Sequence, residues 1–248
     1  MLNKRVTYGN FRFGIVENEE VKKDTFRMRY EVYAEEFGFE KKEDHPDGLE
    51  TDEYENESLH FACLNQNDSV IGTIRLVLDS DKGFPIEHAV ETKFIGKKPD
   101  RSKIAEISRL TVSKDLRRRK EDGIHGVESY ITKEQGGILP NGGSIPEEMK
   151  GRKNPILVLG LYQVMYHETK RRGITHWYMI TEEKLFYALE KYGFKFHKIG
   201  EPVWYHGWRI PYLGIIEEIE KTLFETNQDM FEVMLTGLEK EYHPPVFK

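Results

Sequence analysis

The sequence predicts an α/β domain built on a mixed β-sheet with helices on both faces. Apolar residues recur with a period of two in several short stretches, and with helical spacing in the stretches between them. Two strand-like stretches, LHFACLN and VIGTIRLVLD, are separated only by the polar turn QNDS, which predicts an antiparallel hairpin. Strands then alternate with helices, so we expect a sheet of mixed direction covered on both sides.

The expected strands are apolar or alternating stretches bounded by turn residues. They cover residues 11–18, 59–65, 70–79, 103–112, 175–181, 194–200 and 204–216. We expect Pro211 to break the last of them, because proline cannot donate a ladder hydrogen bond.

The expected helices carry apolar side chains three or four residues apart. They cover residues 24–40, 84–90 (a short helix or turn), 155–173, 182–193 and 217–242. In the first helix, Asp24 is placed to cap the N-terminus and Gly38 to end the helix. In the third, Pro155 stands near the first turn, and Gly173 follows a basic last turn.

Two segments lack a periodic pattern. Residues 41–58 are acidic and contain a proline and a glycine, which predicts a loop. The long segment from about 117 to 154 is rich in glycine and charge, so we expect a functional or disordered insertion. One domain is therefore expected over residues 1–216, with an amphipathic helical extension over 217–248 packed on it; the oligomeric state is open.

Composition argues against several classes of protein. The 37 basic and 43 acidic residues give a net charge of −6, and they are interspersed, which argues against a nucleic-acid binder. No stretch approaches the ~20 apolar residues of a membrane helix. The single cysteine, Cys63, cannot form an internal disulfide, which fits a cytoplasmic protein, and it reads as a packed strand residue rather than a nucleophile. His167-Glu168 lacks a second histidine four residues after the first, so we predict no metal.

The stretch KIAEISRLTVS carries Glu106 and Arg109 three positions apart in an apolar strand. Side chains of a strand alternate between faces, so these two would point to opposite sides of the sheet. Burying an unpaired charge is costly. A one-residue β-bulge would bring both side chains to one face. An edge strand, or an ion pair that only fixes neighbouring strands, is the structural alternative.

Four stretches carry a family likeness in this order: RYEVYAEEFGFE, GLETDEYENESLHF, VIGTIRLV and AEISRLTVS. They resemble the first-helix, acidic-segment and arginine-strand motifs of the GNAT acyltransferases. The matching positions are Arg29, Tyr33, Phe39, Glu50, Asp52, Glu55, Arg75, Glu106 and Arg109. Within that fold the sequence resembles the acyl-homoserine-lactone synthases and the long-chain N-acyl amino acid synthases. Its length, arginine run and insertion are most similar to the bacterial acyltransferases associated with exosortase (PEP-CTERM) systems.

The resemblance implies the GNAT fold, in which the fourth strand is bulged and splays from the fifth to admit the pantetheine arm of an acyl donor. It places the bulge near Ser108 and makes the backbone N–H of Leu110 a donor to the thioester oxygen. Glu106, beside Arg109, is the first candidate for the general base. Glu43 or Asp52 from the acidic loop are the alternatives.

Two departures from the GNAT pattern affect the donor. Leu189 occupies the place of a tyrosine that protonates the leaving thiolate in many GNAT enzymes, and Tyr187 and Tyr192 are out of register. The glycine-rich pyrophosphate loop is also missing; an acyl carrier protein needs less of this loop than coenzyme A does, and both donors stay open. The run Arg117, Arg118 and Arg119 is then expected to bind the phosphopantetheine or its carrier, or else forms a solvated turn.

The remaining candidates would bound the substrates. We expect the acyl pocket to be formed by Leu157, Leu161, Met165, Trp177, Met179 and Trp204. Substrate binding is also expected of Arg29, Tyr33, Phe39 and Arg75. Some of these have a structural alternative: the residues of helix 155–173 as core, Arg29 as a helix brace and Arg75 as support for the acidic loop.

The resulting prediction is an N-acyltransferase that moves a long-chain acyl group to the amine of a small acceptor such as an amino acid. Its co-substrate would be an acyl-carrier-protein or coenzyme A thioester, with no permanently bound cofactor. A homoserine-lactone signal synthase is the alternative within the enzyme class. The alternative outside it is a non-catalytic GNAT-fold module that binds acyl carriers or a partner protein.

Overall fold

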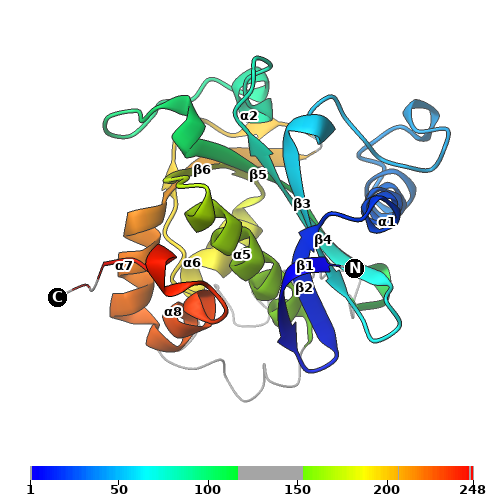
Figure 1. The fold of residues 1–248 in the computed structure, drawn as a ribbon. Coiled ribbons are helices and arrows are strands. Elements are labelled where there is room, and N and C mark those ends of the chain that lie inside the picture. The colour runs from blue at the N-terminus through cyan, green and yellow to red at the C-terminus, as the bar shows by residue number, and fades with distance from the viewer. Residues whose placement is uncertain (1, 117–152, 206, 246, 248) are drawn as a thin grey trace, which may run out of the picture.

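The computed structural model describes residues 2–116, 153–205, 207–245 and 247 (Figure 1). In these residues nine strands form one sheet. The strands are β1 (Leu2–Tyr8), β2 (Phe11–Val16), β3 (Ser58–Leu64), β4 (Val70–Leu78), β5 (Ile104–Val112), β6 (His176–Thr181), β7 (His197–Lys198), β8 (Val203–Trp204) and β9 (Trp208–Ile215).

The sheet has the predicted mixed direction. Its order is β1-β2-β3-β4-β5-β6-β9-β7, with β8 paired to β9, and every pair is antiparallel except β5–β6. The edge strand β1 was not predicted, because its sequence LNKRVTY has three polar residues in succession. Because of this extra strand, the strand that was predicted as the fourth is numbered β5 in the structure.

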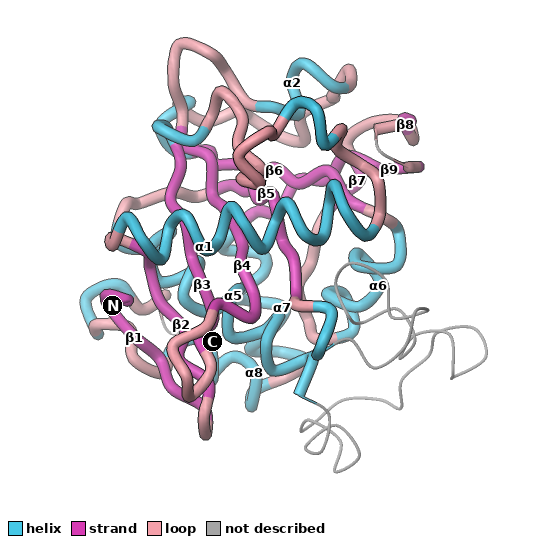
Figure 2. Tube along the Cα trace, turned by 90° about the vertical axis from the view of Figure 1, so that its right-hand side faces the viewer, coloured by secondary structure: helices cyan, strands magenta, loops and turns pink. Residues whose placement is uncertain are grey.

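Helices cover both faces of the sheet, as predicted. They are α1 (Glu19–Tyr30), α2 (Pro85–Ala89), α5 (Lys153–Arg171), α6 (Glu183–Lys191), α7 (Ile216–Thr226) and α8 (Gln228–Leu235). Figure 2 looks onto the face that α1 crosses, with α5 behind the strands and α7 and α8 on that far side. None of the described helices is both long and apolar enough to cross a membrane.

Helix α1 begins earlier than predicted. Its N-cap is Asn18, whose side chain accepts hydrogen bonds from the N–H groups of Glu20 (3.0 Å) and Val21 (3.1 Å). Asp24 lies inside the helix, so its prediction as the N-cap was wrong; the short polar side chain of Asn18 satisfies the free N–H groups instead. After Tyr30 the chain continues as a π-helical stretch over Glu31–Glu36, and Gly38 follows with φ +65°.

Helix α5 packs closely on the sheet because it carries Gly160. A Cβ atom there would lie 2.6 Å from the ring of Phe13, which is fully buried in β2. The largest apolar core forms at this contact. The helix ends at Arg171, and Gly173 follows with φ +64°, the conformation expected of a residue after a helix.

The C-terminal extension is two helices rather than one. They break at Asn227, which caps α8 by accepting a hydrogen bond from the N–H of Met230 at 3.2 Å. The extension lies against α5: the Gln163 amide donates to the Thr236 carbonyl at 2.9 Å, and the Tyr166 hydroxyl donates to Glu220 at 2.7 Å.

The strand predicted over 204–216 is a small hairpin. Pro211 lies within β9 and pairs with Ile180 of β6, so its prediction as a strand breaker was wrong. The break is the turn between β8 and β9, where Gly207 has φ +111°. This turn brings Tyr205 and Arg209 to the cavity described below.

Candidate active site

A β-bulge interrupts the pairing of β5 with β4. Thr73 pairs with Thr111, whereas Arg75 pairs with Ser108, so three steps along β5 oppose two along β4. Arg109 lies in the bulge with φ +52°, a left-handed conformation that is unfavourable for a residue with a Cβ atom. The bulge therefore lies near Ser108, where the resemblance to the GNAT acyltransferases placed it.

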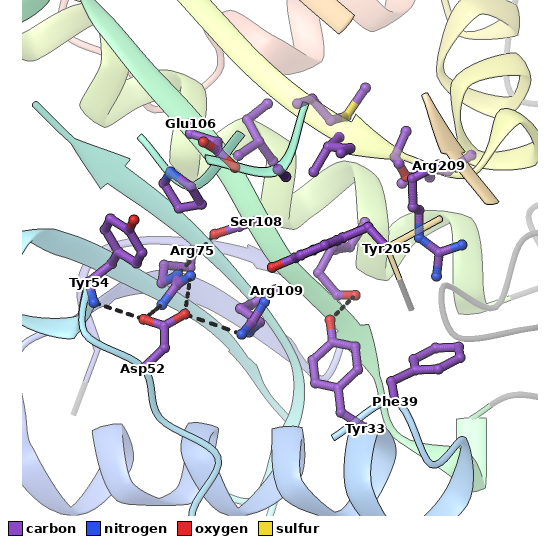
Figure 3. Close-up of a pocket in the computed structure, with 18 of the residues that line it drawn as sticks. Tyr33, Phe39, Asp52, Tyr54, Arg75, Glu106, Ser108, Arg109, Tyr205 and Arg209 are labelled. Carbon is purple, nitrogen blue, oxygen red and sulfur yellow. Dashed lines mark hydrogen bonds and ion pairs between the residues drawn. The ribbon is translucent and has the colours of Figure 1, made fainter. Parts of the chain in front are cut away.

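The bulge brings the predicted charged pair to one cavity. Glu106, Ser108 and Arg109 all line a cavity of about 270 Å³ (Figure 3). Without the extra residue, Arg109 would face the opposite side of the sheet from Glu106. The bulge thus accounts for two charges three positions apart in an apolar strand.

The cavity lies where β5 and β6 separate. Their parallel pairing runs from Ile104 opposite His176 to Ile107 opposite Met179, and no later pair forms between these two described strands, although β5 continues to Val112. Strand β6 continues to pair with β9. The two strands therefore diverge from the residue that precedes Ser108, which leaves a slot between strand edges that do not pair with each other.

Glu106 is a buried carboxyl group at this slot. Its side chain accepts a hydrogen bond from the backbone N–H of Ile86 at 2.8 Å, and the residue is 1% exposed. Burial raises the pKa of Glu106 to about 8, although the Ile86 N–H and the guanidinium groups of Arg75 and Arg109 act in the opposite direction. A carboxyl group with a pKa near neutrality is suited to accept a proton from an amine substrate.

The backbone at the bulge is the second feature of the slot. Arg109 and Leu110 have no partner residue in the register between β4 and β5. The Leu110 carbonyl accepts a hydrogen bond from the Tyr33 hydroxyl at 3.3 Å, and Leu110 lines the cavity. The backbone N–H of Leu110, at this irregular position on the cavity wall, is a candidate donor to a developing oxyanion.

Three arginines and three carboxylates form a network under the cavity. Asp52 accepts two hydrogen bonds from Arg75, at 2.6 and 2.8 Å, and Arg109 lies 2.9 Å from Glu50 and 3.2 Å from Asp52. Arg29 donates to Glu50 and, at 2.6 Å, to Glu55. Burial opposes the ionised form of Glu50, but Arg109 and Arg29 outweigh it and lower its pKa to about 2. The paired charges hold the acidic loop against the bulged strand.

The alternative bases, Asp52 and Glu43, are both poorly placed to accept a proton from a substrate. Burial opposes ionisation of Asp52, yet its hydrogen bonds and ion pairs with Arg75 and Arg109 hold its pKa below the usual value. Asp52 lines the cavity, but as a carboxylate held by two arginines it is a poor proton acceptor. Glu43 is exposed in the 3₁₀ turn Lys42–Asp44 and does not line the cavity, because the acidic loop turns its side chain to solvent.

The arginine and aromatic residues of the first helix divide into two groups. Arg29 is fully buried in the network and does not line the cavity, which favours its interpretation as a brace. Tyr33 and Phe39 line the cavity, where the guanidinium groups of Arg109 and Arg209 lie over their rings at 5.7 and 5.6 Å.

Most of the predicted acyl pocket is core instead. Leu157, Leu161, Met165 and Trp177 are buried in the main apolar cluster and do not line the cavity. Among the described side chains of α5, Tyr162 lines the cavity, and it also belongs to the main apolar cluster. Met179 lines the cavity, together with Ile180 and Leu185.

Trp204 does not contribute to the acyl pocket either. Its side chain is 69% exposed on β8, paired with Trp208, and absent from the cavity wall. It lies on the hairpin that was predicted as one continuous strand. The predicted run Arg117, Arg118 and Arg119 lies outside the described residues.

Several cavity residues were not predicted from the sequence. Tyr54, Tyr162, Tyr205 and Arg209 all line it, and Figure 3 shows the Tyr205 hydroxyl directed toward the strand that carries Ser108 and Arg109. Leu189, which occupies the helix position of the missing tyrosine, is buried in the apolar core and does not line the cavity. The available signal was the segment WYHGWR, whose glycine indicates a turn.

Comparison with known proteins identifies the fold. Residues 28–123 match the family model described as an acetyltransferase (GNAT) domain. The comparison with curated proteins finds no significant match. This part of the chain is thus similar to a GNAT acetyltransferase domain, and the predicted GNAT fold is confirmed.

Solved structures with the same fold include three acyl-homoserine lactone synthases or their complexes. BjaI, a CoA-dependent acyl-homoserine lactone synthase solved with SAM and isopentyl-CoA, has a TM-score of 0.56 at 18% identity, covering 90% of this chain and 84% of that one. TofI, in a ternary complex with an inhibitor and MTA, has a TM-score of 0.56 at 14% identity, covering 88% of this chain and 98% of that one. The AHL synthase LasI has a TM-score of 0.56 at 13% identity, covering 87% of this chain and 94% of that one.

Proposed function

We propose that the protein transfers an acyl group from a thioester to the amine of a small acceptor. The observation that carries this proposal is the placement of Glu106 beside the bulge at the point where β5 and β6 diverge. A slot between strand edges that do not pair with each other suits the extended, amide-bearing pantetheine arm of an acyl carrier protein or coenzyme A. The donor is a co-substrate, and no permanent cofactor is needed for this chemistry.

Each step of the transfer has a group in the cavity. Glu106 takes a proton from the acceptor ammonium, which leaves a neutral amine. The amine nitrogen attacks the thioester carbon, and the N–H of Leu110 stabilises the oxygen as it becomes negative. The intermediate then passes its second amine proton to the departing sulfur as the carbon–sulfur bond breaks, so that an amide and a thiol form, and Glu106 returns the first proton to solvent. A thiolate with a pKa near ~8.5 can leave without full protonation.

Arg109 and Ser108 support this geometry rather than react. Arg109 lies in the bulge, and its guanidinium group bonds to Glu50 at 2.9 Å, which holds the bulge in place. The Ser108 hydroxyl accepts a hydrogen bond from Arg75 at 2.9 Å. Apolar side chains at Met179, Ile180 and Leu185 give the start of an acyl chain a contact surface.

The test is mass spectrometry of small molecules from cells that overexpress the protein. Cells with the natural sequence should contain an acylated amine that cells with Glu106→Gln lack, and its mass reports acyl length and acceptor together. Glu220→Gln is the matched control, because Glu220 is also buried but lies outside the cavity. If the profile is unchanged while the protein still binds acyl-carrier thioesters, the protein is a binding module and the proposal of an enzyme is wrong.

A further inference from the structure

Helix α2 touches the candidate base directly. The N–H of Ile86, in its first turn, donates to Glu106 at 2.8 Å, and Ile86 is fully buried. Pro85 and Ala89 of the same helix line the cavity. A displacement of α2 would therefore change both the cavity wall and the hydrogen bond on Glu106.

The outer side of α2 is held by Arg101, while Lys98 lies 3.6 Å from Glu87 and the His88 ring bonds to the Lys82 carbonyl at 2.8 Å. Arg101 donates to both carboxylate oxygens of Glu87, each at 2.9 Å, and its Nε donates to Asp79, also at 2.9 Å. Glu87 in turn accepts a hydrogen bond from the N–H of Phe84, the residue before the helix, at 3.0 Å. Arg101 thus fixes the start of α2 through a two-pronged contact with Glu87.

The surrounding residues are arranged around this contact. The Arg101 guanidinium lies 5.0 Å from the centre of the Phe84 ring, which is fully buried and packs edge-on against Tyr178. Gly83 has φ +73°, and a Cβ atom there would lie 3.0 Å from a Glu87 carboxylate oxygen. The close approach of this backbone to the ion pair therefore depends on glycine.

The charges near Glu106 give the direction of the effect. Arg75 and Arg109 lower the pKa of Glu106, and Glu87 raises it. The charge of Glu106 in turn raises the pKa of Tyr54 and Tyr178. Loss of Arg101 would leave the Glu87 carboxylate less compensated and would loosen the Ile86 N–H. Both changes disfavour the ionised form of Glu106.

We propose that Arg101 is a positioning residue for acyl transfer: by fixing α2, it holds the Ile86 N–H against the Glu106 carboxylate and keeps Glu106 able to accept a proton. The inference rests on the proposed function, in which Glu106 is the base. Arg101 itself does not line the cavity.

The first test is the pH profile of kcat/KM in Arg101→Gln. A hydrogen bond to a charged group is worth about one pKa unit, so the ascending limb should move up by about that much. Transfer should be about tenfold slower at pH 7 and approach the natural rate near pH 10, with KM for the donor unchanged. A merely structural loss would lower the rate at every pH.

The matched control is Arg12→Gln. Like Arg101, Arg12 is a partly exposed arginine with a carboxylate partner, Asp68 at 2.8 Å, and it does not line the cavity. Unlike Arg101, it lies on β2 and pairs with no residue of α2. Its pH profile should be that of the natural protein. If Arg101→Gln does not fold, Arg101→Lys carries the same test, because lysine keeps the charge without the two-pronged contact and should give a smaller shift in the same direction.

A second readout is independent of turnover. The carboxyl carbon of Glu106 is followed by ¹³C NMR during a pH titration, with Glu106→Gln used to identify the signal. A higher midpoint in Arg101→Gln supports the inference even if no acyl donor is turned over, in which case only the proposed function fails. An unchanged midpoint in a folded variant overturns the inference, whatever the activity.

Discussion

Replacing Glu106 by glutamine should stabilise the protein in alkaline solution while it slows acyl transfer. Burial raises the pKa of Glu106 from 4.5 to about 8. The folded protein therefore binds this proton more tightly than the unfolded chain does, and stability is lost as the pH rises from about 4.5 through about 8. Each pKa unit is worth about 1.4 kcal/mol, so the full effect is roughly 5 kcal/mol.

Glutamine removes the ionisation and keeps an acceptor for the Ile86 N–H, which now donates at 2.8 Å. The free energy of unfolding of the two proteins is measured by denaturant titration from pH 5 to pH 9. The advantage of Glu106→Gln should grow across this interval and level off above the pKa of Glu106. A difference that stays constant with pH would mean that Glu106 has an ordinary pKa, and the base assignment would lose its physical reason.

Three further substitutions probe other parts of the site. Arg75→Met should destabilise the fold by about 3 kcal/mol, because Asp52 loses both hydrogen bonds from Arg75 and keeps the 3.2 Å contact with Arg109. A loss under about 1 kcal/mol in denaturant titration would contradict the network. Met179→Ala should shift the acyl lengths of the product seen by mass spectrometry, whereas Leu157→Ala should cost about 2–5 kcal/mol of stability with the same product lengths. Glu43→Gln should keep the natural turnover, and a large fall in rate would bring Glu43 back as a base.

The bulged strand shows how much of the fold the sequence can reveal. Glu106 and Arg109 violate the alternation of an otherwise apolar strand, which from the order of the residues indicates a bulge or an edge strand, and the resemblance to the GNAT acyltransferases favours the bulge. The hairpin of β3 and β4 was equally predictable, since a polar turn separates two apolar runs. Such features depend only on residues that are neighbours in the chain.

The edges of the fold were harder to predict. The side chain of Asn18, rather than Asp24, caps α1, and both are good capping residues at the start of plausible helices. Pro211 is accommodated inside β9, where the pairing with β6 does not need its missing N–H. In both cases the choice depends on tertiary packing, which a local pattern does not contain.

The cavity wall was the least predictable part. Leu157 and Leu161 have the same apolar spacing as any residue on the buried face of α5, so periodicity cannot separate core from pocket. Tyr205 and Arg209 reach the cavity only because the turn at Gly207 folds β8 onto β9. Arg75 was assigned both to substrate and to support, and it does line the cavity while it pairs with Asp52.

The most direct test of acyl transfer at the bulge is thiol release from an acyl-pantetheine thioester by the purified protein. The rate is followed with and without a mixture of amino acids and other small amines. The natural protein should release thiol faster when amines are present, with an amide as the product, and Glu106→Gln should be about 100-fold slower with unchanged donor binding. Equal rates for the two proteins would contradict the assignment of Glu106, and no amine-dependent release with any donor would contradict acyl transfer itself.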